Sequence, residues 1–294
     1  MIPPEYVIND KRDSNFFKKT SFTGYCMKDV LAIFTKSIIN NKIEDACNWG
    51  VELLISGHVE ELFDKLIIIC MKHININNPN IAYFIYDRYS VFIPIKEKYK
   101  NNLSIRNNQQ IRNMVAECCF IVCNSLKTKP ISCVKIKDSE FDMICIESKF
   151  IANSADIVSD KIKYGDPEET KIILNEFNYC LINKKYEMCV YWLSWICELE
   201  KKSTKKNKMY ICGYRKIQNI DTKYCNDIIW FIWEIILNEV NKLGDDNIIK
   251  NVYSLYKLYK YEFRPSKKTK RMPYIIYAIK YFTDSYHFTH YCTN

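Results

Sequence analysis

The spacing of apolar side chains is the sequence feature that most limits how this chain can fold. Over residues 43–54 the apolar positions recur every three or four residues, which aligns them along one face of a helix. This stripe consists of Ile43, Ala46, Cys47, Gly50, Leu53 and Leu54. The same spacing predicts helices over 59–70 and 111–122, and Asn78-Pro79 has the form of a cap and a first-turn proline that open another helix.

The C-terminal half carries the same kind of pattern. Asp166-Pro167 combines a cap with a first-turn proline, and acids follow at positions that suit a helix N-terminus. Further helices are predicted over 184–200, over 228–237, from Asp245-Asp246 to residue 259, and from Pro273 onward. Between 127 and 150 the spacing degrades, and this stretch is expected to be an extended linker, with a short strand at 131–137 as an alternative.

Glycine is scarce, with six residues among 294. Sandwiches and doubly wound α/β folds use many glycines in tight turns and phosphate loops, so the shortage favours helices. We therefore expect an all-α fold of about ten helices, with an N-terminal half at 1–126, a linker at 127–150 and a C-terminal half at 151–294. Residues 42–49 align with 185–192, which suggests a duplicated unit stacked as in an α-solenoid or another helical-repeat protein.

Motifs for the common enzyme classes are missing from the sequence. No lysine follows a glycine, so a phosphate-binding loop of the G-x-x-x-x-G-K-[ST] type is excluded, and neither G-x-G-x-x-G nor G-x-S-x-G occurs. Only four histidines are available for acid–base chemistry near neutral pH. We therefore predict no enzyme activity, no catalytic residues and no cofactor.

The cysteines and histidines do not predict a metal site. Fourteen cysteines are scattered without a C-x-x-C pair, and many occupy helical core positions, as expected of reduced thiols in an intracellular protein. The nearest approach to a ligand set is His287-x-x-His290-x-Cys292, which we interpret as a polar tail without a bound metal. The most apolar stretch, 228–237, is interrupted by Glu234 and too short to span a membrane, so no membrane association is expected.

Two runs of basic residues are candidates for binding nucleic acid. The net charge is +9, and residues 151–294 hold 23 basic and 17 acidic side chains. The runs follow aromatic-rich segments, are predicted to be loops and contain no acid. They consist of Lys201, Lys202, Lys205, Lys206 and Lys208 and of Arg264, Lys267, Lys268, Lys270 and Arg271. Such cations can bind a phosphate backbone without reading sequence, although solvated loops or a nuclear import signal are alternatives.

The tryptophans form two pairs with helical spacing. Trp192 and Trp195 lie three residues apart, as do Trp230 and Trp233, so each pair shares a helix face. Aromatic residues on a helix face can anchor a partner protein, but core packing is the interpretation that we favour within such apolar helices.

Several segments resemble an uncharacterised helical protein family of nucleocytoplasmic large DNA viruses, of the mimivirus and phycodnavirus kind. They are 22–25 (FTGY), 46–53 (ACNWGVEL), 210–216 (YICGYRK), 226–234 (NDIIWFIWE) and 268–279 (KTKRMPYIIYAI). The resemblance runs through most of the chain and implies no active site. It implies a viral protein of the host cytoplasm, in the viral factory, with the nucleus as an alternative location.

The expected function is that of a non-enzymatic adaptor or scaffold. Helical surfaces offer long grooves to peptides and partner helices, so we expect a viral or host protein partner from the replication, transcription or translation machinery. The first alternative is a nucleic-acid-binding accessory factor that uses the basic runs 201–208 and 264–271. A viral scaffold of translation initiation ranks below both.

Overall fold

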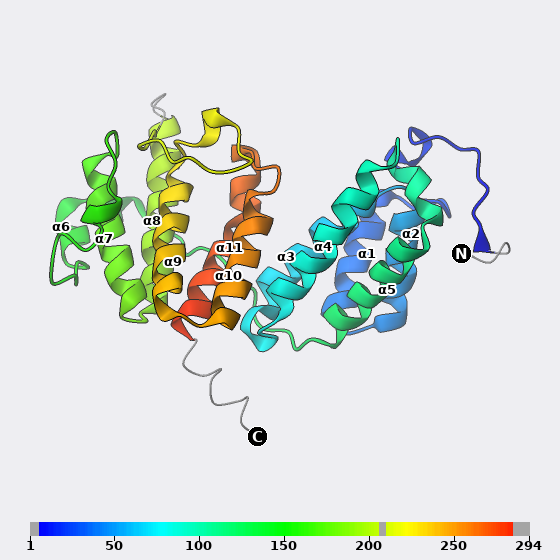
Figure 1. Cartoon of the computed structure of the whole chain (residues 1–294), viewed down its shortest axis with the longest axis horizontal. Coiled ribbons are helices and arrows are strands. Elements are labelled where there is room, and N and C mark those ends of the chain that lie inside the picture. The colour runs from blue at the N-terminus through cyan, green and yellow to red at the C-terminus, as the bar shows by residue number, and fades with distance from the viewer. Residues whose placement is uncertain (1–5, 206–209, 285–294) are drawn as a thin grey trace, which may run out of the picture. The chain divides into compact units, whose positions relative to one another are not determined.

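The computed structural model describes residues 6–205 and 210–284 (Figure 1). Within these residues the all-α prediction is confirmed, because the chain forms helices and no β-strand, only one isolated bridge between Thr20 and Cys26. Ten of the described α-helices have eleven residues or more, in agreement with the expected number. The chain divides into two compact units between Pro130 and Ile131, which is a point inside the predicted 127–150 linker.

Unit 1, the part before Ile131, is built from five helices. These are α1 (Met27–Ile39), α2 (Ile43–Ile55), α3 (Val59–Ile69), α4 (Ile81–Glu97) and α5 (Gln109–Asn124), and a π-helical turn, Cys70–Ile74, follows α3. Helix α2 packs against both α1 and α5. The stripes predicted over 43–54, 59–70 and 111–122 supply the buried face of three of these helices, so those predictions are confirmed.

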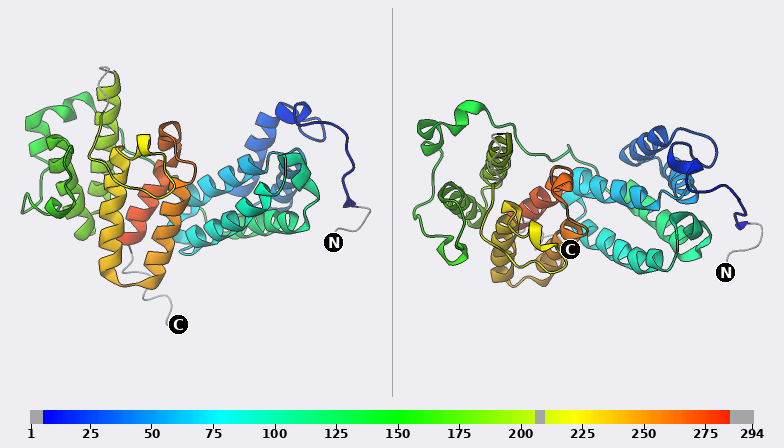
Figure 2. Two further views of the ribbon diagram at one scale, coloured as in Figure 1. Left: turned by 45° about the horizontal axis from the view of Figure 1, so that its top comes forward. Right: turned by 90° about the horizontal axis from the view of Figure 1, so that it is seen from above.

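Unit 2 contains the remaining helices. These are α6 (Met143–Glu147), α7 (Glu168–Ile182), α8 (Tyr186–Lys205), α9 (Ile228–Leu243), α10 (Asp246–Lys260) and α11 (Pro265–Thr283). Helix α7 pairs with α8 and α10 with α11, and α9 contacts α7, α10 and α11, as the views in Figure 2 also show. The four tryptophans of the two predicted pairs are all buried, which confirms their interpretation as core residues: Trp192, Trp195, Trp230 and Trp233.

Local capping chemistry explains where several of these helices begin. The Asp245 side chain accepts hydrogen bonds from the backbone N–H groups of Asn247 and Ile248 at 2.9 and 3.0 Å, which confirms the predicted start of α10. Likewise, the Asp227 side chain caps α9 by accepting from Ile229 N–H at 2.9 Å.

The last helix begins earlier than the sequence indicated. We expected Pro273 to open it, but α11 starts at Pro265, and Pro273 lies inside the helix. Proline has no N–H to donate. In the first turn of a helix this costs no hydrogen bond, because backbone N–H groups there have no acceptor within the helix. The predicted loop 264–271 is therefore largely the first two turns of α11, and the predicted loop at 201–205 is the last turn of α8.

The predicted linker is only partly extended. Residues 129–137 have no regular structure and no strand, and Asp138–Phe141 and α6 then form two short helical turns. The Asp142 side chain caps α6 by accepting from Ile144 N–H at 3.0 Å. This second part belongs to unit 2 and forms one wall of the site described next. The duplication of the two halves is not tested by these contacts and stays a prediction.

Candidate partner-binding site

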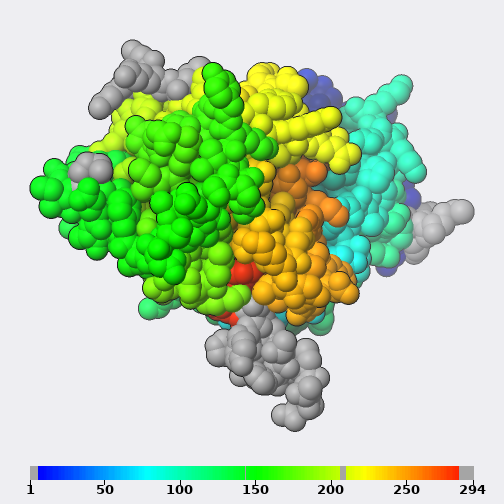
Figure 3. Space-filling view, turned by 60° about the vertical axis from the view of Figure 1, so that its left-hand side comes forward, coloured from blue at the N-terminus to red at the C-terminus, as the bar shows by residue number. Residues whose placement is uncertain are grey.

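An apolar pocket of about 380 Å³ lies in unit 2 between α7, α8 and the segment 138–150, which we call the wall segment. The wall segment and α7 contribute the green surface of unit 2 in Figure 3. Seven apolar and three polar side chains line the pocket: Phe141, Ile146, Phe150, Ile172, Ile173, Trp195 and Leu199, with Glu169, Lys202 and Ser203. A concave, mainly apolar surface with a few polar groups is the usual form of a binding site.

Aromatic stacking and one indole hydrogen bond attach the wall segment to α8. The rings of Phe141 and Trp195 stack with their centroids 4.8 Å apart, and Trp195 Nε1–H donates to the Glu140 carbonyl at 2.9 Å. Lys202 Nζ lies 3.8 Å from the centroid of the Phe141 ring and 2.6 Å from an Asp138 carboxylate oxygen. Phe141 and Trp195 thus form an aromatic part of the pocket lining. The Trp195–Glu140 hydrogen bond and the Lys202–Asp138 ion pair fix its position.

Glu140 organises the turn that precedes α6. Its carboxylate accepts from Lys137 N–H at 2.9 Å and lies 2.9 Å from Lys149 Nζ. The hydrogen bond from the Lys137 backbone, together with Lys149, lowers the pKa of Glu140 to about 2, so this carboxylate stays ionised at neutral pH.

The opposite wall is α7, which carries Glu169, Ile172 and Ile173 into the pocket. Ile173 is buried, whereas Ile172 is 49% exposed at the pocket. One turn further along, the buried Glu176 carboxylate accepts from Ile151 N–H at 2.9 Å and so joins α7 to the end of the wall segment.

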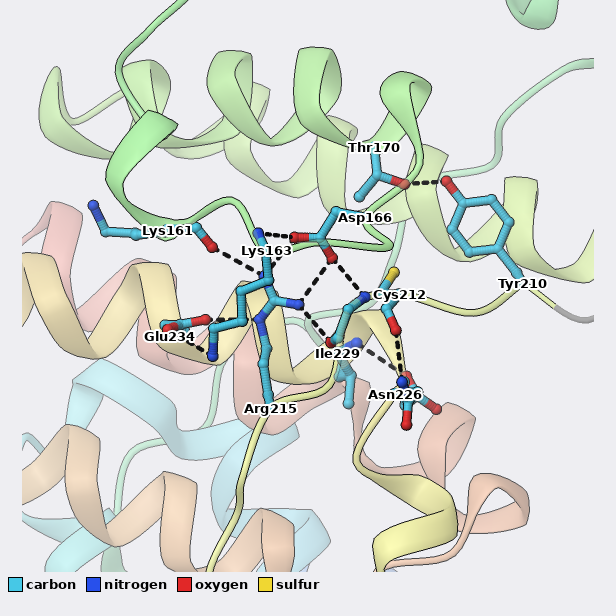
Figure 4. Close-up of polar contacts among 12 residues, drawn as sticks. Lys161, Lys163, Asp166, Thr170, Tyr210, Cys212, Arg215, Asn226, Ile229 and Glu234 are labelled. Atoms are coloured by element: carbon cyan, nitrogen blue, oxygen red, sulfur yellow. Dashed lines mark hydrogen bonds and ion pairs between the residues drawn. The ribbon is translucent and has the colours of Figure 1, made fainter.

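A buried ionic cluster fixes the start of α7 (Figure 4). Arg215 is 2% exposed, and its Nη1 and Nη2 donate to the two carboxylate oxygens of Asp166 at 2.9 and 3.0 Å. Its Nε donates to Glu234 on α9 at 2.7 Å. Asp166 also accepts from the N–H groups of Lys163 and Gly213 at 2.8 and 2.9 Å. We call this group the Arg215 cluster; it anchors the turn before Pro167 to α9.

Gly213 is required by the close approach of chain segments in this cluster. A Cβ built at Gly213 would lie 2.8 Å from the Tyr164 carbonyl oxygen and 2.8 Å from Lys163 Cβ. Real Cβ atoms do not approach a backbone oxygen so closely. Only glycine at position 213 therefore allows the segment 210–217 to lie against the turn at 163–166.

At least four of the eight cations of the two predicted basic runs that the structure describes form ion pairs. Lys201 Nζ lies 3.0 Å from Glu198, Lys202 bonds Asp138 as described, and Lys267 Nζ lies 3.4 Å from Glu262. Lys205 is exposed at the end of α8, and Lys206 and Lys208 lie outside the described residues.

Two residues of the second run are buried, contrary to the prediction of an exposed loop. Lys268 Nζ lies 2.5 Å from Glu200 and 2.6 Å from Asp227, and Arg271 donates to the carbonyls of Tyr259 and Tyr261. Burial by itself would lower the pKa of Lys268, but the two carboxylates raise it above 10.5. Both cations therefore hold α11 in place, while Arg264 and Lys270 of the same run remain exposed.

The pocket was not among the sites predicted from the sequence. Its lining comes from three segments, and no local pattern reveals that they meet. The one available signal was the pair Trp192 and Trp195: both are buried, as predicted, and Trp195 also contributes to the lining of the pocket.

Neither a metal-binding cluster nor a membrane-spanning helix occurs in the described part of the chain. There, no three His, Cys, Asp or Glu side chains lie close enough to hold a metal ion; the predicted polar tail with His287, His290 and Cys292 lies outside that part. Among those same residues, no helix combines the length and apolar character that crossing a membrane requires. Compared with known proteins, the chain matches no protein-family model, no curated protein and no solved structure.

Proposed function

We propose that this chain is a non-enzymatic helical adaptor that binds a segment of another protein in the apolar pocket of unit 2. The observation that carries the proposal is the pocket itself, together with the exposed apolar side chain of Ile172 in its lining. Ile172, which lines the pocket, is 49% exposed. Apolar side chains clustered around an apolar concavity gain free energy when a partner covers them.

The occupant that fits best is an amphipathic helix with a lysine or arginine beside its apolar face. The pocket has two charged residues, and Lys202 is already engaged by Asp138 and by the Phe141 ring. Glu169 is the other, and within the described residues it forms no ion pair. A basic side chain of the partner would therefore complement Glu169, while apolar side chains at helical spacing would fill the pocket.

The biological setting of the proposal rests on the resemblance stated above. It is an infected cell, where the adaptor would act in the viral factory of the host cytoplasm or in the nucleus. The partner would then be a viral or host protein of the replication, transcription or translation machinery, and a scaffold of translation initiation is the narrowest form of this proposal.

Affinity capture from infected cells, with nuclease treatment and quantitative mass spectrometry, tests the proposal. The informative comparison is Ile172→Glu against Ile182→Glu, because both residues are exposed on α7, at 49% and 44%, and only Ile172 lines the pocket. We expect one set of proteins to be lost with Ile172→Glu and retained with Ile182→Glu. Equal retention by both variants would contradict binding at this pocket.

Nucleic-acid binding is the second candidate, and one observation favours it. The ion pair between Lys268 and Glu200 joins the start of α11 to the last turns of α8, so the two basic runs meet at one end of unit 2 (Figure 1). The cations there include the exposed Arg264 and Lys270 and the half-buried Lys267, which pairs with Glu262. Replacing these three by alanine is expected to weaken RNA or DNA binding and to reduce its dependence on salt. Unchanged binding would remove this candidate.

A further inference from the structure

Two cysteines of unit 1 face each other across its closest helix pair. Cys47 lies on α2 and Cys119 on α5. Cys119 Sγ also lies 3.6 Å from the Ala46 carbonyl oxygen, so it sits over the turn of α2 that carries Cys47. Gly50, on the next turn, permits this approach, because a Cβ there would be 3.1 Å from Cys119 Sγ.

The two thiols differ in solvent access and in acidity. Cys47 is half-buried and Cys119 fully buried. The hydrogen bond from Cys119 lowers the pKa of Cys47 to about 7, although burial opposes this shift. The same hydrogen bond and burial raise the pKa of Cys119. The other titratable group that faces Cys47 from α5 is Cys123, whose pKa burial raises to about 11, so at neutral pH the thiolate resides on Cys47.

We propose that Cys47 and Cys119 are an oxidisable dithiol, in which a hydroperoxide oxidises Cys47 and Cys119 then closes a disulfide between α2 and α5. In the first step the Cys47 thiolate attacks the peroxide oxygen, forms a sulfenic acid and releases hydroxide or alkoxide. In the second step the Cys119 thiol loses its proton, and its sulfur displaces the sulfenic oxygen as water. The peroxide gains the two electrons that the two sulfurs lose. Cys119 Sγ already lies against the turn of α2 that carries Cys47, so the two cysteines occupy facing positions of one packed helix pair.

The reactivity of Cys47 tests the first part of the proposal. At pH 7 a thiol with a pKa of about 7 is half ionised, against roughly 1% for one at 9.0. A thiolate of lower pKa is also a weaker nucleophile, by about tenfold over this interval, so the net advantage is about fivefold. We therefore expect Cys119→Ala to slow iodoacetamide alkylation of Cys47 about fivefold at pH 7. Cys123→Ala is the matched control on α5 and should leave the rate within twofold.

The second part is tested on the unaltered full-length chain. After treatment with hydrogen peroxide, peptide mapping should find the Cys47 and Cys119 peptides joined, with the loss of two hydrogen atoms and no second chain involved. Cys47→Ser should abolish the joined peptides, and Cys145→Ser, which removes an exposed thiol, should not. Formation of a Cys47 sulfinic acid without joined peptides would overturn the proposal. So would an alkylation rate at Cys47 that Cys119→Ala leaves unchanged.

Discussion

Replacing Arg215 by methionine is expected to destabilise unit 2 strongly. Methionine keeps most of the volume of the arginine stem but removes every hydrogen bond that the guanidinium donates to Asp166 and Glu234. The Asp166 side chain is fully buried, so its carboxylate would be left in the interior without a cation to offset the cost of its burial. Breaking a buried pair from one side costs about 3–5 kcal/mol. Because Asp166 keeps two backbone N–H donors, we expect about 3 kcal/mol, the lower end.

Tryptophan fluorescence during urea denaturation measures this loss. Four of the five tryptophans lie in unit 2, so the signal reports mainly on that unit. With a urea dependence near 3 kcal/mol/M, a loss of about 3 kcal/mol lowers the midpoint by about 1 M. The matched control is Lys223→Met, which breaks an exposed 2.8 Å pair with Asp221 in the same unit and should leave the urea midpoint nearly unchanged. Equal effects of the two substitutions would refute the reasoning.

Acid provides an independent check on the same cluster. Burial would raise the pKa of Asp166, but the hydrogen bonds from Arg215 and from backbone N–H groups outweigh burial and lower it below 3.8. A carboxylate with a lowered pKa in the folded state stabilises the protein above its unfolded pKa, and this contribution is lost as pH falls through the folded pKa. Without Arg215, burial raises the pKa of Asp166 in the variant, so acid relieves the variant while it removes the contribution of the cluster from the native chain. The stability difference between the native chain and Arg215→Met should therefore be largest near neutral pH and shrink as the pH falls. A difference that grows on acidification would contradict this sign.

Two further substitutions test how unit 2 is held together. Lys268→Met should cost about 3 kcal/mol of stability, because the Glu200 and Asp227 carboxylates would lose their shared cation. Thermal unfolding followed by circular dichroism measures this loss. A variant of normal stability with weaker nucleic-acid binding would contradict the structural role of Lys268. Gly213→Ala should cost about 1–3 kcal/mol of stability, because the new methyl group meets the Tyr164 carbonyl. The shift of the urea midpoint measures this cost, and an unchanged midpoint would show that the turn at 163–166 moves freely.

Helix positions were predictable from the sequence wherever local chemistry decides them. The stripe that begins at Ile43 and the cap at Asp245 each depend on residues within one or two turns, and both predictions are confirmed. The start of α11 was not predictable in the same way. Lys268 has the character of a solvated loop residue, but its carboxylate partners lie 41 and 68 residues away in the sequence. Only those partners make a basic first turn favourable beside a helix N-terminus, where cations are otherwise disfavoured.

The candidate site could not be predicted for a related reason. Phe141 lies in the stretch where helical spacing degrades, and Ile172 and Trp195 lie on two different helices. Their common pocket depends on how the wall segment folds back, through the hydrogen bond from Trp195 to Glu140. Composition did indicate excess positive charge, but whether a given cation is free or paired depends on these same distant contacts.

Titration of a captured partner against purified chain is the most direct test of the proposed adaptor role. An isoleucine side chain gains roughly 1.5–3 kcal/mol when fully buried, and about half of the Ile172 side chain remains to be covered. Ile172→Glu removes that gain and adds the cost of placing a carboxylate at an apolar contact. We therefore expect it to raise the dissociation constant about tenfold or more. Ile182→Glu should leave it within twofold. Equal affinities for the two variants would show that the partner binds elsewhere.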